Sequence, residues 1–137
     1  MRVFLDTNVL VSAFVTRGLC ADVVRHVVAE HELVVAEVVL EELQRVLRQK
    51  FELPQQTVRD ILAFLEEHPI QPKPKSASSI RIRDTDDQWV LASALAAKAD
   101  VLVTGDDDLL DIKGEITGIV ITDPRGFWNM RRKPVTE

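Results

Sequence analysis

Asp6 stands where an acid could do chemistry at the edge of a sheet. It ends the short apolar run of residues 3–5, and such continuous runs are typical of parallel strands that are covered on both faces. Open α/β sheets bind ligands beyond the carboxyl ends of their strands, so Asp6 is placed for a ligand site. The competing interpretation is that Asp6 or Asn8 only caps a helix that begins near Val9.

Asp106 repeats this arrangement later in the chain. It follows the apolar residues 101–103, Thr104 and Gly105, so the turn Thr104-Gly105-Asp106 also lies at the end of a predicted strand. Here the alternatives are ordinary loop chemistry for Asp106, and capping of the short segment at residues 109–110 by Asp107 or Asp108.

A third acid is selected by its position on a predicted helix over residues 37–51. At 100° per residue, one apolar stripe of this helix is formed by Val39, Leu43, Val46 and Leu47. Glu41 falls on the opposite side and is expected to face water. Glu42 falls at the edge of the stripe, where its carboxylate can lean toward a cleft or simply reach solvent.

Asp87 is the fourth acid, in a helix expected to start at Thr85, because Thr85 and Gln88 have the spacing of a capping box. It shares a face with the apolar residues Val90, Leu91, Ala94 and Leu95, whereas Asp86 lies off that face. An unpaired buried charge is costly, so Asp87 needs a partner, which a metal ion can supply. The alternative to a metal-binding role is that Asp87 only stabilises the helix, because acids in the first turn interact favourably with the helix dipole.

These four carboxylates predict a metal site if a parallel α/β layer brings them to one crevice. Four like charges repel each other unless cations neutralise them. Oxygen-only ligands suit Mg²⁺ or Mn²⁺, which bind through carboxylates and substrate phosphates. The chemistry indicated is metal-assisted phosphodiester hydrolysis, in which one ion activates water and a second can stabilise the leaving oxygen.

The remaining pattern predicts a single α/β domain over residues 1–137 that positions these acids. Strands are expected at 3–5, 33–36, 101–104 and 118–122, and helices at 9–14, 20–30, 37–51, 55–67 and from 85. Three prolines and three serines make residues 69–83 a surface connection, with a short extended piece at Ile70 or at 80–82. A tail begins at about residue 124, and its Phe127 and Trp128 are expected to pack on the body rather than to stack on bases.

Composition restricts the class of protein further. With 137 residues, 46% hydrophobic and 28% charged, the chain is typical of one globular domain, and it has no apolar run of about 18 residues. Asp6 interrupts the first apolar run before a secretory signal could form, and the lone Cys20 excludes an internal disulfide and a cysteine-based zinc site. A cytoplasmic location without membrane association is therefore expected. The net charge of −5 argues against binding nucleic acid by overall basicity, but not through bound metal.

The ordered set of motifs resembles the PIN-domain nucleases, and within them the toxin components of VapC-like toxin–antitoxin systems. The resemblance runs over nearly the whole chain, through Leu5-Asp6-Thr7-Asn8, Glu42-Leu43, Asp86-Asp87 and Val103-Thr104-Gly105-Asp106. It places the family's four acids at Asp6, Glu42, Asp87 and Asp106, with Asn8 supporting Asp6.

The resemblance implies a three-layer α/β/α sandwich on a mainly parallel sheet, and cleavage of single-stranded RNA with one or two Mg²⁺ or Mn²⁺ ions. For toxin members it also implies a homodimer and a cognate antitoxin. This chain departs from many relatives in having Ala36 in place of a serine, which puts supporting hydrogen bonds there in doubt. The acids at 106–108 leave open which takes the fourth place, and Asp108 is the reserve for Asp106.

Two other classes compete with this interpretation. A phosphatase or phosphotransferase of the haloacid-dehalogenase type needs a second Asp two residues after the first, where this chain has Asn8. A receiver domain needs a late lysine after a strand, whereas Lys113 follows a predicted short helix. A catalytically inactive RNA-binding or interaction module of the same fold is the non-enzymatic alternative, against which the presence of all four acids counts.

Overall fold

A five-stranded parallel sheet organises the computed structural model, which describes residues 1–77, 82 and 84–131. The strand order is β3-β2-β1-β4-β5. The strands are β1 (Arg2–Leu5), β2 (Glu32–Ala36), β3 (Ile70–Gln71), β4 (Val101–Val103) and β5 (Val120–Thr122). In the register of the sheet, Phe4 of the central strand pairs with Val34 on one side and Leu102 on the other. The four strands expected from the sequence are confirmed, and the short extended piece lies at Ile70.

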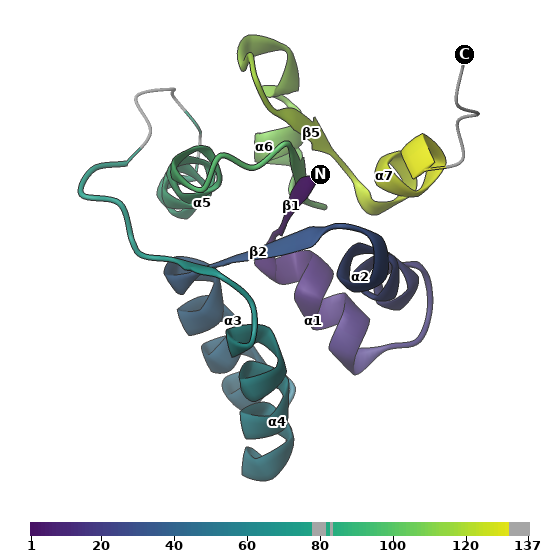
Figure 1. Cartoon of the computed structure of the whole chain (residues 1–137). Helices are drawn as coiled ribbons and strands as arrows, with labels where there is room; N and C mark the ends of the chain where they lie inside the picture. The colour runs from purple at the N-terminus through teal and green to yellow at the C-terminus, as the bar shows by residue number, and fades with distance from the viewer. Residues whose placement is uncertain (78–81, 83, 132–137) are drawn as a thin grey trace.

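Helices cover both faces of this sheet, which gives the expected three-layer α/β/α architecture. They are α1 (Thr7–Val15), α2 (Leu19–Glu30), α3 (Glu37–Gln49), α4 (Gln55–Glu66), α5 (Thr85–Ala96), α6 (Asp107–Leu110) and α7 (Pro124–Arg131), with a 3-10 turn at Lys113–Glu115. Helices α1 to α4 lie on one side of the sheet, and α5 and α6 lie on the other (Figure 1). Helices α3 and α5 also contact each other.

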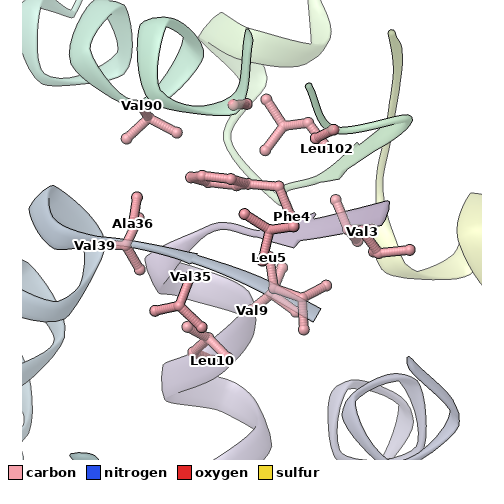
Figure 2. Close-up of a cluster of buried hydrophobic side chains, with 14 of the residues drawn as sticks. Val3, Phe4, Leu5, Val9, Leu10, Val35, Ala36, Val39, Val90 and Leu102 are labelled. Atoms are coloured by element: carbon pink, nitrogen blue, oxygen red, sulfur yellow. The ribbon is translucent and has the colours of Figure 1, made fainter. Parts of the chain in front are cut away.

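The core is built from the central strand outward. Phe4 points to the face that carries Val90 of α5, whereas Leu5 points to the face that carries Val9 of α1 (Figure 2). Both strand residues are buried, and full burial of such a side chain contributes roughly 1.5–3 kcal/mol. Because β1 is anchored on both faces, the residue that follows it, Asp6, starts from a fixed position.

The start of α5 differs from the predicted capping box in one respect. Asp84, not Thr85, is the N-cap, and its side chain accepts a hydrogen bond from the Asp86 N–H at 2.9 Å. Thr85 is the first helical residue, as expected, so it cannot also be the cap. Leu95, expected on the buried face with Asp87, is 40% exposed.

The segment after Asp123, expected as a tail, contains the helix α7. Phe127 is buried, and α7 contacts α2 and β5, so the expected packing of its aromatic residues on the body is confirmed. The ring of Phe127 lies 6.3 Å from that of His26 in α2. The other proposed extended piece, at residues 80–82, falls largely outside the described residues.

Within the described residues, no single helix has both the length and the apolar composition needed to cross a bilayer. Helices α1 and α2 meet the criterion only when they are joined, and they are bent by 107° relative to each other.

Candidate functional site

Asp6 lies at the carboxyl end of β1 and is held by three hydrogen bonds. Its Oδ1 accepts from the Thr7 N–H at 2.7 Å, and its Oδ2 accepts from Thr104 Oγ1 at 2.7 Å and from Asn8 Nδ2 at 3.2 Å. The side chain is only 4% exposed. Asp6 is also the N-cap of α1, so the capping interpretation and a place in an acidic centre apply to the same residue.

The ends of β1 and β4 are tied together by short side chains. Thr104 Oγ1 donates to Asp6 and accepts from the Asp106 N–H at 3.0 Å, while Asn8 Oδ1 accepts from the Gly105 N–H at 2.8 Å. A Cβ atom on Gly105 would lie 3.3 Å from Asn8 Oδ1, so a glycine suits this close approach. This network links the first and fourth candidate acids through Thr104.

Asp87 enters from the first turn of α5 and is 6% exposed. Its Oδ2 atom is buried and has no hydrogen-bond partner among the described residues. Its neighbour Asp86 is exposed, as the angular position of the two residues in the helix predicted. A buried carboxylate oxygen without a partner is costly, so Asp87 is the group in this region that most needs a cation or a proton.

Asp106 and Asp108 complete a cluster with Asp87. Each of the three offers a carboxylate oxygen, and these oxygens all lie within 4.8 Å of one another. Asp106 is the N-cap of α6 and accepts from the Asp108 N–H at 2.8 Å, so the alternative interpretation, in which Asp107 or Asp108 caps this helix, is wrong. Asp107 is exposed, whereas Asp106 and Asp108 are half-buried. Asp108 therefore stands beside Asp106 rather than replacing it.

Glu42 approaches the cluster from α3. It is half-buried, whereas Glu41 is exposed, which agrees with their predicted positions on the helix. The Glu42 charge acts on Asp6, because it is one of the groups that raise the pKa of Asp6. The structure thus brings the four predicted acids to the carboxyl end of the central strands. Among the residues that the structure describes, Asp87, Asp106 and Asp108 are the acids whose carboxylate oxygens lie close enough together to share one ion.

The protonation of this centre reflects burial and like charge. Burial raises the pKa of Asp6 from 3.8 to about 6, hydrogen bonds from Thr104 and Thr7 oppose the rise, and the charges of Glu42 and Asp106 add to it.

Burial also raises the pKa of Asp87, from 3.8 to about 8, with further contributions from the charges of Asp106, Asp6 and Asp84. Both groups therefore resist ionisation when no cation is present. Oxygen ligands, mutual repulsion and an unpartnered buried oxygen make this donor set fit a hard divalent cation.

Two hollows flank Glu42. One, of about 370 Å³, lies between α3 and α5 and includes Arg45, Lys73 and Trp89 in its lining. The other, of about 400 Å³, lies between α1 and α3 and includes Asn8, Lys50 and Phe51. The sequence interpretation missed both, because the residues that line them are far apart in the chain and show no common periodicity.

A family model described as the PIN domain matches residues 2–108. A search of curated proteins finds no significant match.

Solved structures share the fold at low sequence identity. VapBC2 from Rickettsia felis, bound to a DNA fragment from its promoter, has a TM-score of 0.66 and 18% identity, covering 90% of this chain and 98% of that one. VapBC-1 from nontypeable Haemophilus influenzae has a TM-score of 0.61 and 20% identity, covering 91% and 99%. The PIN domain endonuclease Utp24 has a TM-score of 0.50 and 17% identity, covering 89% and 84%.

Proposed function

The chain belongs to the PIN domain family, and on this premise we propose that it is a metal-dependent ribonuclease that cleaves phosphodiester bonds of single-stranded RNA. One observation carries the proposal. The buried carboxylate of Asp87 has an oxygen without a partner, and it lies within 4.8 Å of ligand oxygens from Asp106 and Asp108. Such a group needs a cation or a proton, and a cation bound at the strand ends would lie where a substrate phosphate can reach it.

We assign Asp87, Asp106 and Asp108 as the residues that would hold Mg²⁺ or Mn²⁺, with Asp6 and Glu42 completing the acidic centre. A bound ion of this kind lowers the pKa of water and stabilises charge on phosphate oxygens. The protein's own part is positioning. Thr104 and Asn8 orient Asp6, and the Asp106 N–H is fixed by Thr104.

We further propose that the chain is the toxin of a toxin–antitoxin pair, acting as a homodimer and inhibited by its antitoxin. The support is the family membership together with the similarity of fold to VapBC proteins over about nine-tenths of the chain. A cytoplasmic location, where RNA is accessible, is part of the same proposal.

An RNA-cleavage assay tests the enzymatic part. Purified protein should cut single-stranded RNA with Mn²⁺ and not with EDTA, and Asp6→Asn should abolish the metal-dependent activity. Equal cleavage by wild type and Asp6→Asn would reject the assigned centre, and no cleavage with any divalent ion would favour an inactive module of the same fold.

Expression of the chain alone tests the toxin part separately. Growth should stop on induction, and Asp6→Asn should remove the effect. Rescue by the product of a neighbouring gene would identify the antitoxin, whereas normal growth with full nuclease activity would contradict the toxin assignment.

A further inference from the structure

The hollow between α3 and α5 adjoins the acidic centre and has a different chemical character from it. Its lining consists of Val38, Glu41, Glu42, Arg45, Lys73, Asp86, Trp89 and Val90. Glu42 belongs to the acidic centre as well, and Asp86 is the neighbour of Asp87 in the chain. A molecule whose phosphate sits at the acidic centre can therefore reach this hollow past Glu42.

Trp89 presents a ring face to a cation in this hollow. The Nζ atom of Lys73 lies 4.5 Å from the centre of the indole ring, and Trp89 is only half-buried. A nucleobase stacked on an aromatic ring generally contributes more to binding than an exposed lysine over the same ring. A base can therefore displace the ammonium group and leave it free to meet a phosphate.

Arg45 supplies a second cation at a useful position. It lies three residues after Glu42 in α3, so both side chains share one face of the helix, about one turn apart. Neither Arg45 nor Lys73 forms a salt bridge with another described residue. Both cations are therefore available to the backbone of a bound nucleic acid.

We infer that this hollow is a nucleotide-binding subsite, in which Trp89 stacks on one unpaired base of the RNA while Lys73 and Arg45 hold a phosphate next to the cleaved bond. The inference rests on the proposed ribonuclease function and names where its substrate binds. An acidic peptide would pair with Lys73 and Arg45 but would offer no flat group to stack on the indole ring of Trp89. A nucleotide offers a base to stack on the ring and a phosphate to pair with the two cations.

Tryptophan fluorescence tests the stacking directly, because the chain has only two tryptophans, Trp89 and Trp128. The protein is used in an Asp87→Asn background, so that RNA is bound but not cut under the proposed function. Trp128→Phe leaves Trp89 as the only indole, and a short single-stranded RNA should quench its emission to saturation. Trp89→Phe leaves Trp128 in α7, and the same RNA should produce no quenching.

A strand of the same length with abasic residues separates stacking from phosphate contact. It should bind the Trp128→Phe protein roughly tenfold more weakly than the intact strand, because stacking on an aromatic ring is lost. Equal affinity for the two strands, or equal quenching in both tryptophan variants, would overturn the inference. Quenching by an acidic peptide but not by RNA would also overturn it, in favour of a protein partner.

Kinetics in the active enzyme distinguishes failure of the subsite from failure of the proposed function. Trp89→Leu should raise KM for RNA roughly tenfold and change kcat by less than about threefold, and Trp89→Phe should recover much of the loss. Melting curves of the variants establish that they are folded. If wild type cuts RNA and Trp89→Leu has an unchanged KM, the subsite is wrong and the nuclease assignment stands; if wild type cuts no RNA, the nuclease assignment fails.

Discussion

Asp87 combines burial, like-charged neighbours and an unpartnered oxygen in one side chain. Its neighbours Asp106 and Asp6 raise its pKa in addition to the effect of burial. A residue of this kind destabilises the metal-free protein when it ionises and gains most when a cation arrives. Asp87 should therefore destabilise the metal-free protein and stabilise the metal-bound protein.

Replacing this residue tests that reversal. In EDTA at neutral pH, Asp87→Asn should raise Tm by roughly 3 °C or more, because the amide carries no charge and can donate to Asp106. Wild type should gain stability from Mn²⁺, and Asp87→Asn should lose most of that gain. Differential scanning fluorimetry measures both effects.

Asp86→Asn is the matched control, since Asp86 is exposed and adjacent in the same helical turn. It should leave both the Tm in EDTA and the gain from Mn²⁺ nearly unchanged. A lower Tm for metal-free Asp87→Asn, or full Mn²⁺ stabilisation in that variant, would count against Asp87 as the residue in need of a cation.

The pH dependence of stability has a definite sign in the metal-free protein. A carboxyl group whose pKa is raised on folding contributes stability below its ordinary pKa of 3.8, and loses it as the pH rises through the raised value. For Asp6 that window ends at about 6 and for Asp87 at about 8. For Asp6 alone, the loss is roughly 3 kcal/mol.

Urea unfolding in EDTA, at a series of pH values spanning the two raised pKa values, measures this loss. The free energy of unfolding should fall as the pH rises through the window, and saturating Mn²⁺ should flatten the curve. A metal-free protein whose stability increases across the same window would show that these carboxyl groups are not destabilised by ionisation.

At the scale of elements, the end of β4 controls the geometry of the centre. Thr104 is fully buried, and its hydroxyl joins Asp6 to the backbone of Asp106. Its removal should loosen both acids at once although Thr104 offers no carboxylate of its own.

Thr104→Val keeps the shape of the side chain and deletes both hydrogen bonds. We expect a loss of about 1–3 kcal/mol in the free energy of unfolding and a 10- to 100-fold weaker Mn²⁺ affinity, which calorimetry can measure. Thr122→Val, at the end of the neighbouring strand β5, is the matched control and should leave Mn²⁺ binding unchanged. Equal Mn²⁺ affinity in Thr104→Val and wild type would contradict this role.

The sequence predicted most elements because their apolar periodicity is strong. The angular positions of Glu42 and Asp87 placed each acid correctly relative to its exposed neighbour, since the faces of α3 and α5 are set by adjacent apolar residues. The helix α7 was missed, because it is short and begins at Pro124 with Gly126 inside it. Gly126 suits the tight turn from β5 into the start of α7, since a Cβ atom there would collide with Thr122 Oγ1.

Capping was predicted less well than position in the helix. Asp84 and Thr85 can both cap, as can Asp106 and its two acidic neighbours, and the local sequence does not decide between them. In α6, a hydrogen bond from the turn before the helix determines which acid is the cap. Thr104 binds the Asp106 N–H and so fixes the turn that makes Asp106 the cap of α6. The two hollows beside Glu42 depend on segments far apart in the sequence and had no sequence signal.

At the scale of the whole molecule, a chain of net charge −5 is proposed to act on a polyanion. Overall attraction cannot bring RNA to it. Binding must depend on local features, namely cations such as Arg45 and Lys73 beside the centre and divalent ions within it. The sheet makes this possible, because it gathers acids from four separate segments at one edge, beside the hollow that Arg45 and Lys73 help to line.

The acids at 106–108 allow the most direct test of this account in one measurement. The initial rate of RNA cleavage is compared, at saturating Mn²⁺, for wild type, Asp106→Asn, Asp107→Asn and Asp108→Asn. Asp106 and Asp108 belong to the cluster with Asp87, whereas Asp107 is exposed and outside it. We expect about a 100-fold or greater loss for Asp106→Asn and Asp108→Asn, and a change of less than about threefold for Asp107→Asn. Equal rates for the three variants would contradict the assignment of this centre.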